Sequence, residues 1–131
     1  MKQELTLNEW RDAIHANAVA HGWWDDGERN FGEIIALCHS ELSEALEADR
    51  ESMPMVCCPC YEGCEGDEEA DCLKCLETHP NIKPDGAAVE LVDCIIRILD
   101  WCGQYNIDVD KLMKLKHVYN IGRPHKHGKR Y

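Results

Sequence analysis

Two short acidic motifs, each inside a strongly apolar stretch, are the residues of this chain best suited to chemistry. One is Glu41-Leu-Ser-Glu44 and the other is Glu90-Leu-Val-Asp93. Residues three apart lie on one face of a helix, so each motif places two carboxylates side by side. If the two helices pack together, a like-charged pair about 6 Å apart costs about 3 kcal/mol at an effective dielectric of about 20. A divalent cation removes this repulsion, and Mg2+ and Mn2+ prefer such oxygen ligands.

Helices are the elements expected to position these motifs, and no segment alternates convincingly at period two. Thr6-Leu-Asn-Glu9 fits a capping box, and Asp108 is a suitable N-cap for the last helix. The helices are expected over residues 7–21, 30–50, 86–101 and 108–120. Glycines at 22 and 103 are expected to end the first and third of them. The sequence therefore predicts an all-α helical bundle, with a short hairpin inside residues 52–85 as the one possible exception.

The helix expected over residues 86–101 is apolar around most of its circumference, which is typical of a helix buried on most sides. Its polar positions form one narrow stripe made of Glu90, Asp93, Arg97 and Asp100. Three other helices of one small domain cannot easily cover it, so we expect a subunit interface to supply the rest. For the preceding helix the expected buried seam is Ile35, Cys38, Leu42 and Leu46.

Length and charge limit the class of protein. The chain has 131 residues, enough for one domain, and a formal net charge of −11, which argues against stable nucleic-acid binding. From Lys111 to Tyr131 it carries seven Lys or Arg and no Asp or Glu. It has no signal peptide and no apolar stretch that could span a membrane, so we expect a soluble, cytoplasmic protein without a membrane partner. An acidic cluster combined with a basic C-terminal segment suits a metal site that faces a polyphosphate, and a basic tail that is simply solvated is the alternative.

Residues 52–85 break the helical pattern with four prolines and two glycines and contain six of the nine cysteines. Such a long connection is not expected to be an idle loop. Two Cys-x-x-Cys pairs, Cys57 with Cys60 and Cys72 with Cys75, have a spacing that suits a tetrahedral structural Zn2+. Cys58 and Cys64 are alternative ligands, and disulfides or reduced thiols remain open. The other three cysteines fall at apolar helical positions and are expected to be buried: Cys38, Cys94 and Cys102.

A resemblance covers roughly residues 8–51 and 84–130. The matching segments are Asn30-Phe-Gly-Glu33, Glu41-Leu-Ser-Glu44-Ala-Leu-Glu47, Ala88-Val-Glu90-Leu-Val-Asp93, Lys116-His-Val-Tyr119-Asn120 and Arg123-Pro-His-Lys-His127-Gly-Lys129. In this order they resemble the MazG-like superfamily of all-α nucleoside triphosphate pyrophosphohydrolases. One departure is plain, because 45 residues separate Glu44 from Glu90, whereas a much shorter connection is usual in that superfamily.

The resemblance implies Mg2+-dependent (or Mn2+-dependent) hydrolysis of (deoxy)nucleoside triphosphates between the α and β phosphates, for nucleotide-pool control. It implies that the metal is bound by Glu41, Glu44, Glu90 and Asp93. One of the glutamates would orient the attacking water, and Glu47 is a further possible ligand. The candidates for contacting phosphate, sugar or base are Trp24, Lys116, Asn120, Arg123 and His127. The resemblance also implies a homodimer or homotetramer.

Two other functions fit parts of the pattern. A zinc-bearing interaction module would leave the acidic stripe solvated and use the cysteine-rich segment to bind a partner. A phosphoribosyl-ATP pyrophosphohydrolase would share the metal motifs, but the Trp23-Trp24 loop and the basic tail fit it less well.

Overall fold

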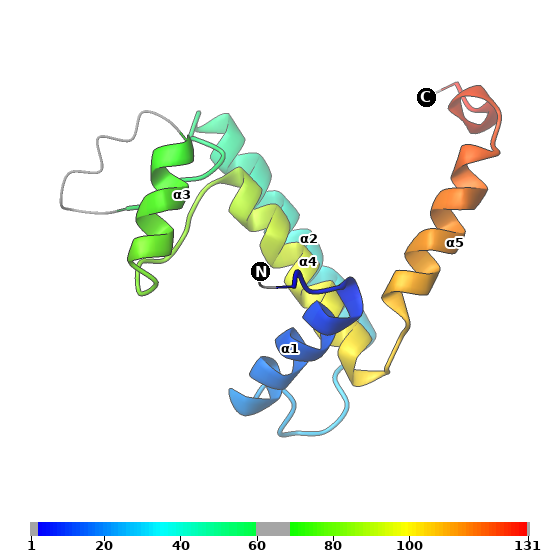
Figure 1. Cartoon of the computed structure of the whole chain (residues 1–131), viewed down its shortest axis with the longest axis horizontal. Helices are drawn as coiled ribbons and strands as arrows, with labels where there is room; N and C mark the ends of the chain where they lie inside the picture. The colour runs from blue at the N-terminus through cyan, green and yellow to red at the C-terminus, as the bar shows by residue number, and fades with distance from the viewer. Residues whose placement is uncertain (1–2, 60–68, 131) are drawn as a thin grey trace. The chain divides into compact units, whose positions relative to one another are not determined.

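The computed structural model of this protein describes residues 3–59 and 69–130, and the described chain is helical. It contains five α-helices and one short 3-10 helix (Figure 1). They are α1 (Leu7–Ala20), α2 (Phe31–Arg50), α3 (Glu69–Thr78), α4 (Ala87–Gln104), α5 (Val109–Ile121) and η1 (His125–Gly128). The β pairing in the described residues is a single antiparallel bridge between Cys57 and Asp85. The all-α fold class is therefore confirmed, and none of the described helices is long and apolar enough to cross a membrane.

Capping side chains set the starts of α1, α2 and α5. Thr6 and Glu9 form a reciprocal box, in which the Glu9 backbone N–H donates to Thr6 Oγ1 at 3.1 Å and the Thr6 N–H donates to the Glu9 carboxylate at 2.7 Å. Asn30 and Asp108 each accept a hydrogen bond from the backbone N–H three residues ahead, at 3.2 and 3.0 Å. These bonds satisfy amide groups that a helix start otherwise leaves without a partner.

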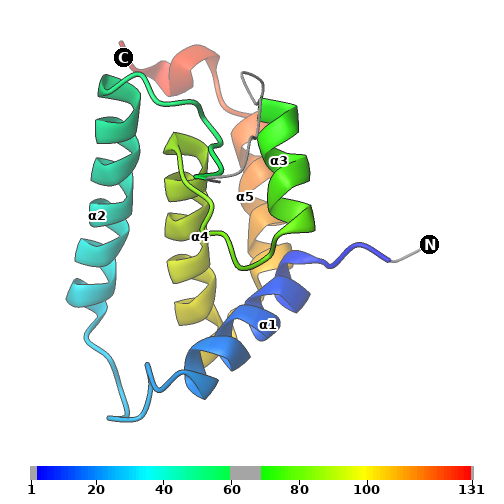
Figure 2. The same cartoon turned by 90° about the vertical axis from the view of Figure 1, so that its left-hand side faces the viewer.

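The chain divides into two compact units. The central unit is Asp26–Ile98, and the terminal unit is Met1–Asp25 together with Leu99–Tyr131. Helix α4 contributes its longer part to the central unit and its last turns to the terminal unit. Within the central unit, α2 and α4 lie side by side (Figures 1 and 2).

Small residues form the contact between α2 and the start of α4. Ala45, Ala48 and Ala87 form one buried cluster, with Met53 packed against it. Just before α4, Gly86 adopts φ +114°, and a Cβ there would clash with the backbone carbonyls of residues 54 and 55. Only glycine fits this approach, so the segment before α3 is held against the start of α4.

The buried face of α2 differs from the predicted seam. Ile35, Leu42 and Leu46 are exposed, and of the predicted seam only Cys38 is buried. The buried residues of this helix are Ile34, Cys38, Glu41, Ala45 and Ala48. The prediction was wrong by about one position because it followed the largest apolar side chains. The face of α2 that packs against α4 instead presents alanines and the carboxylate of Glu41.

Helix α3 was not predicted, and it occupies the middle of the cysteine-rich insertion. Its sequence, Glu-Ala-Asp-Cys-Leu-Lys-Cys-Leu-Glu-Thr, holds no proline or glycine and is rich in helix formers. Prolines and glycines lie on both sides of this segment, so the sequence pattern as a whole predicted a connection without a helix. In the described part of the insertion, the β pairing that a possible hairpin would supply is one bridge between Cys57 and Asp85.

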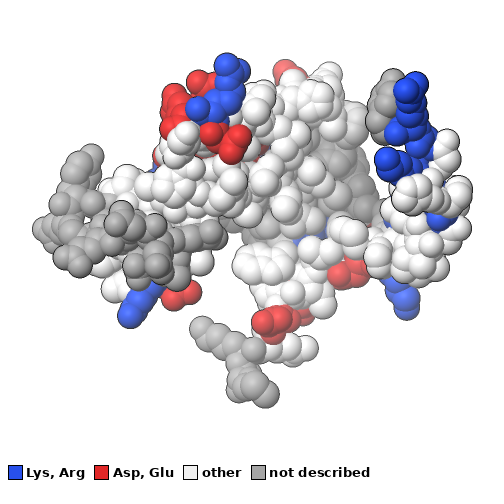
Figure 3. Space-filling view, turned by 90° about the horizontal axis from the view of Figure 1, so that it is seen from above, with Lys and Arg blue, Asp and Glu red and all other residues white. Residues whose placement is uncertain are grey.

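In the terminal unit, α1 and α5 cap each other. The backbone N–H groups of Leu7 and Asn8 donate to the Asp110 carboxylate at 3.2 and 3.1 Å, while the Val109 N–H donates to Asn8 Oδ1 at 2.8 Å. Beyond α5, Lys and Arg side chains gather over the C-terminal segment, at the right of the view in Figure 3. The basic C-terminal segment expected from the sequence thus forms a basic surface.

Helix α4 continues to Gln104 and does not end at Gly103 as predicted. A Cβ on Gly103 would overlap the side chain of His15 on α1. This glycine therefore permits a close helix–helix approach within the terminal unit.

Candidate metal centre

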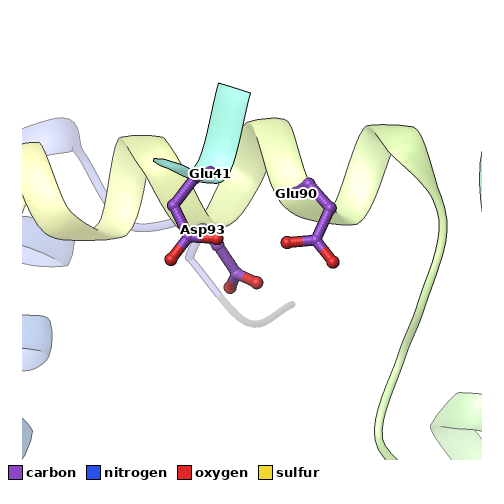
Figure 4. Close-up of side chains that lie close together, drawn as sticks. All are labelled: Glu41, Glu90 and Asp93. Carbon is purple, nitrogen blue, oxygen red and sulfur yellow. The ribbon is translucent and has the colours of Figure 1, made fainter. Parts of the chain in front are cut away.

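Three carboxylates from the two acidic motifs meet in the central unit. Glu41 projects from α2, while Glu90 and Asp93 project from α4 on the same side (Figure 4). One oxygen from each lies within 4.8 Å of the others. Glu41 and Glu90 are only 7% and 8% exposed, and Asp93 is half-buried. The convergence expected from the spacing is therefore present for these three residues.

Repulsion and burial make this cluster costly in its fully ionised form. The pKa of Glu90 is raised to about 7, first by burial, then by its hydrogen bond with Glu41 and by the nearby charges of Glu44, Asp93 and Glu41. The pKa of Asp93 is also raised, by burial and by the charge of Glu41. With a pKa of about 7, Glu90 is protonated in about half of the molecules at neutral pH, where an ordinary glutamate is almost fully ionised. A divalent cation would replace that proton.

Glu44, the fourth predicted ligand, does not join this group. It is exposed on α2, and Ser40 Oγ donates a hydrogen bond to its carboxylate at 3.4 Å. Its charge still contributes to the raised pKa of Glu90, so it lies near the cluster without being part of it. Glu47, the possible extra ligand, is exposed one turn further along and likewise lies outside the group.

Two cations beside the cluster were not assigned a role from the sequence. Arg97 Nε donates to Glu41 Oε1 at 2.7 Å, which joins α4 to α2 at the cluster. Lys83, in the loop before α4, is the strongest of the positive charges that lower the pKa of Asp93. Arg97 follows Asp93 by four residues on the same helix, so the sequence spacing could have predicted that it lies on the same helix face as the acidic cluster. No comparable sequence signal marks Lys83.

The predicted phosphate-binding residues lie in the terminal unit around one aromatic ring. Lys116 Nζ and the Arg123 guanidinium carbon lie 4.8 and 5.6 Å from the centroid of the Tyr119 ring, within cation–π range. The neighbouring Asn120 has a buried Oδ1 that lacks a hydrogen-bond partner among the described residues. His127 is exposed in the short helix η1. The structure thus groups Lys116, Asn120 and Arg123 close to one another.

Trp24, the predicted base-stacking residue, is 9% exposed in the terminal unit. Its indole N–H donates to Asp100, with nitrogen–oxygen distances of 3.0 and 3.2 Å. His15 Nδ1 lies 2.8 Å from Asp100 Oδ1, and the His15 ring meets the Trp24 ring edge-on at 5.4 Å between centroids. Its neighbour Trp23 is 63% exposed. These contacts show Trp24 as part of the packing of the terminal unit, and they leave its role in base binding as a prediction.

Comparison with known proteins provides no relative from which to transfer a function. No family model, no curated protein and no solved structure matches this chain.

The acidic cluster fits a hard divalent cation. Its donors among the described residues are all carboxylate oxygens, and the pKa of Glu90 is raised by burial and by neighbouring carboxylates, both of which a bound cation would offset. Two of its members are buried, so their carboxylates are fixed by packing before a ligand arrives. These properties match the requirements of a Mg2+ or Mn2+ site.

Proposed function

We propose that this chain is a Mg2+-dependent pyrophosphohydrolase that converts (deoxy)nucleoside triphosphates to the monophosphate and pyrophosphate, for nucleotide-pool control in the cytoplasm. The observation that carries the proposal is the convergence of Glu41, Glu90 and Asp93 from two separate helices. The resemblance of the ordered motifs to MazG-like enzymes supplies the reaction class. The basic residues that follow α5 agree with an anionic substrate.

In this proposal Glu41, Glu90 and Asp93 are the metal ligands. When bound, the cation would act as a Lewis acid that neutralises charge on the phosphates and orients them. Binding requires Glu90 to give up its proton, because only a carboxylate is a good ligand. Arg97 holds one oxygen of Glu41, which leaves the other oxygen for the metal.

Glu44 is our candidate for orienting the attacking water. It is exposed on the same helix as Glu41 and close enough to affect Glu90, yet it lies outside the group of three. A solvent-exposed carboxylate near a metal centre can accept a proton from a water molecule as it attacks. The predicted role of Glu44 thus changes from direct ligand to general base.

The substrate contacts in the proposal are Lys116, Asn120 and Arg123, with His127 and Trp24 as further candidates. Arginine binds phosphate as a planar fork, and lysine acts as a point charge. Both cationic side chains already lie against the Tyr119 ring, so they lose less conformational entropy when they bind a phosphate. The buried Asn120 oxygen, which has no hydrogen-bond partner in the part of the chain that the structure describes, is an acceptor that a sugar hydroxyl could use.

The proposed active form is a homodimer or homotetramer. Within one chain, a stripe of large apolar side chains on α4 stays 39–50% exposed: Leu91, Val92, Ile95, Ile96 and Ile98. A contiguous apolar patch of this kind on a helix marks an interaction surface. Symmetric pairing of identical chains is the commonest way to cover one.

The test is pyrophosphate release from the eight common ribo- and deoxyribonucleoside triphosphates and from phosphoribosyl-ATP, with Mg2+, Mn2+ or EDTA. We expect metal-dependent release, lost in Glu41→Gln and Asp93→Asn and retained in Glu47→Gln, a matched change on an exposed turn of α2. Unchanged circular dichroism would show that the inactive variants are folded. Metal-independent release, or full activity in both cluster variants, would refute the proposal.

A further inference from the structure

The cysteine-rich insertion contains a second cluster of metal-binding side chains, separate from the acidic one. Cys58 and Cys72 are buried together with Val56, and Cys75 packs against them with Leu76. Cys72 and Cys75 are three residues apart on α3 and so lie on one helix face. Three thiols from two segments of the chain therefore lie in one small cluster.

The backbone pairing decides which of two adjacent thiols faces this cluster. The Cys57 N–H donates to the Asp85 carbonyl at 2.7 Å, and the Asp85 N–H donates back to the Cys57 carbonyl at 2.9 Å. Successive side chains of an extended segment point to opposite sides. Cys57 is half-buried outside the cluster, whereas Cys58 is one of its buried members. The structure thus favours Cys58, an alternative ligand in the sequence pattern, over Cys57, while Cys60 and Cys64 lie outside the described residues.

His79 adds an imidazole at the edge of the same cluster. Its Nδ1 lies 3.8 Å from the Sγ atom of Cys75 and 3.1 Å from the Cys75 carbonyl oxygen. A contact between one ring nitrogen and a carbonyl is a common second-shell partner of a metal-binding histidine. Here that nitrogen is Nδ1, so Nε2 is the nitrogen left to bind a metal. The sequence also contains the spacing Cys72-x-x-Cys75-x-x-x-His79. His79 was not predicted as a ligand because the two Cys-x-x-Cys pairs already supplied four ligands.

The apolar cluster formed by the described residues of this region is small. Apart from the cysteines, its described members are Val56, Leu76 and Ala88. Burying so few side chains offsets little of the conformational entropy lost by a segment of this length. Three thiols and an imidazole are a poor hydrophobic core but a common ligand set for structural zinc.

We propose that Cys58, Cys72, Cys75 and His79 bind one structural Zn2+ ion that fastens α3 to the segment before it. Each thiol loses its proton to solvent as it binds, and the imidazole binds in its neutral form. Among the described residues these donors are not within 4.8 Å of one another as a group of three, so zinc binding would require their side chains to rotate toward the ion. The inference goes beyond the hydrolase proposal and does not depend on it.

The first test is the zinc content of the protein, purified without chelator and with excess Mg2+ to occupy the acidic cluster. Elemental analysis is expected to find about one zinc per chain, and C72S, C75S and H79A are expected to lose most of it. C102S and H117A are the matched controls, because these residues lie in the terminal unit, and they should retain the zinc. Zinc-free wild-type protein, or full zinc content in C72S and C75S, would overturn the proposal.

A second measurement needs no variant and so does not depend on whether the variants fold. Replacement of zinc by Co2+ should give the visible bands of tetrahedral cobalt with sulfur-to-metal charge transfer, since thiolates supply the ligands. Titration of thiols in denaturant should find all nine cysteines reduced. A cobalt spectrum without thiolate bands, or disulfides in place of thiols, would contradict the proposal.

Discussion

Arg97 Nε donates a 2.7 Å hydrogen bond to Glu41 Oε1, across the two helices that supply the acidic cluster. The Glu41 side chain is 10% exposed, and that of Arg97 is 34% exposed. The guanidinium therefore provides the buried carboxylate with a positive partner and fixes the orientation of the carboxylate. Charge-assisted bonds of this kind are stronger than neutral ones, and loss of one partner leaves the other charge uncompensated.

Replacing Arg97 by Ala should destabilise the metal-free protein by about 1–2 kcal/mol, because Glu41 then remains buried without its partner. Urea unfolding with an unchanged m-value measures this change. Arg50→Ala, at the exposed end of α2, is the control and should stay within about 0.5 kcal/mol of wild type. Equal stability of Arg97→Ala and wild type would show that the bond contributes nothing to folding.

The stability of the metal-free protein should fall as pH rises through the range from about 5 to about 7. The pKa of Glu90 is raised from an ordinary value of 4.5 to about 7 in the fold, so the folded chain holds a proton there that the unfolded chain releases. Stability falls with rising pH wherever the folded state binds more protons, here by at most about 3 kcal/mol for this group. The raised pKa of Asp93 acts in the same direction. Urea unfolding in EDTA across this pH range measures the slope.

Glu90→Gln provides the control for this pH dependence, since its side chain cannot ionise. The variant should show a flatter profile than wild type and a higher metal-free stability at pH values above about 7. Mg2+ should stabilise wild type most at high pH and should stabilise the variant little. The same slope in both proteins would show that Glu90 is not the group responsible.

Trp24→Phe should destabilise the protein by about 1–3 kcal/mol, because it removes the indole N–H group that donates a hydrogen bond to the buried Asp100 carboxylate. Trp23→Phe, at an exposed position, should change stability by less than about 0.5 kcal/mol. Thermal and urea unfolding of the two variants make the comparison. If Trp24→Phe instead raises KM and leaves stability unchanged, its main role is substrate binding.

Ile95→Glu should shift the protein toward monomer, because it places a charge in the exposed apolar stripe of α4. Light scattering during size-exclusion chromatography measures the mass. Leu73→Glu, at a similarly exposed position of α3, is the control and should leave the mass unchanged. A wild-type monomer at micromolar concentration would remove the basis for this prediction.

Much of the helical framework was predictable from local signals. The Thr6–Glu9 capping box and the N-caps Asn30 and Asp108 mark helix starts through bonds between near neighbours, so the sequence alone locates them. The three-residue spacing of Glu90 and Asp93 likewise fixes their common face. Helix α3 was missed because its short pattern lies between proline- and glycine-rich segments.

The tertiary structure decided which of these residues meet. It turned Glu41 inward and left Leu42 and Leu46 exposed, and the buried contact between α2 and the start of α4 is made by alanines. It also left Glu44 outside the cluster and brought in Arg97, which the sequence marked only as part of a polar stripe. Spacing along a helix fixes the relation between neighbours on one turn. The rotation of one helix against another depends on side-chain packing between segments far apart in the chain, which local sequence does not specify.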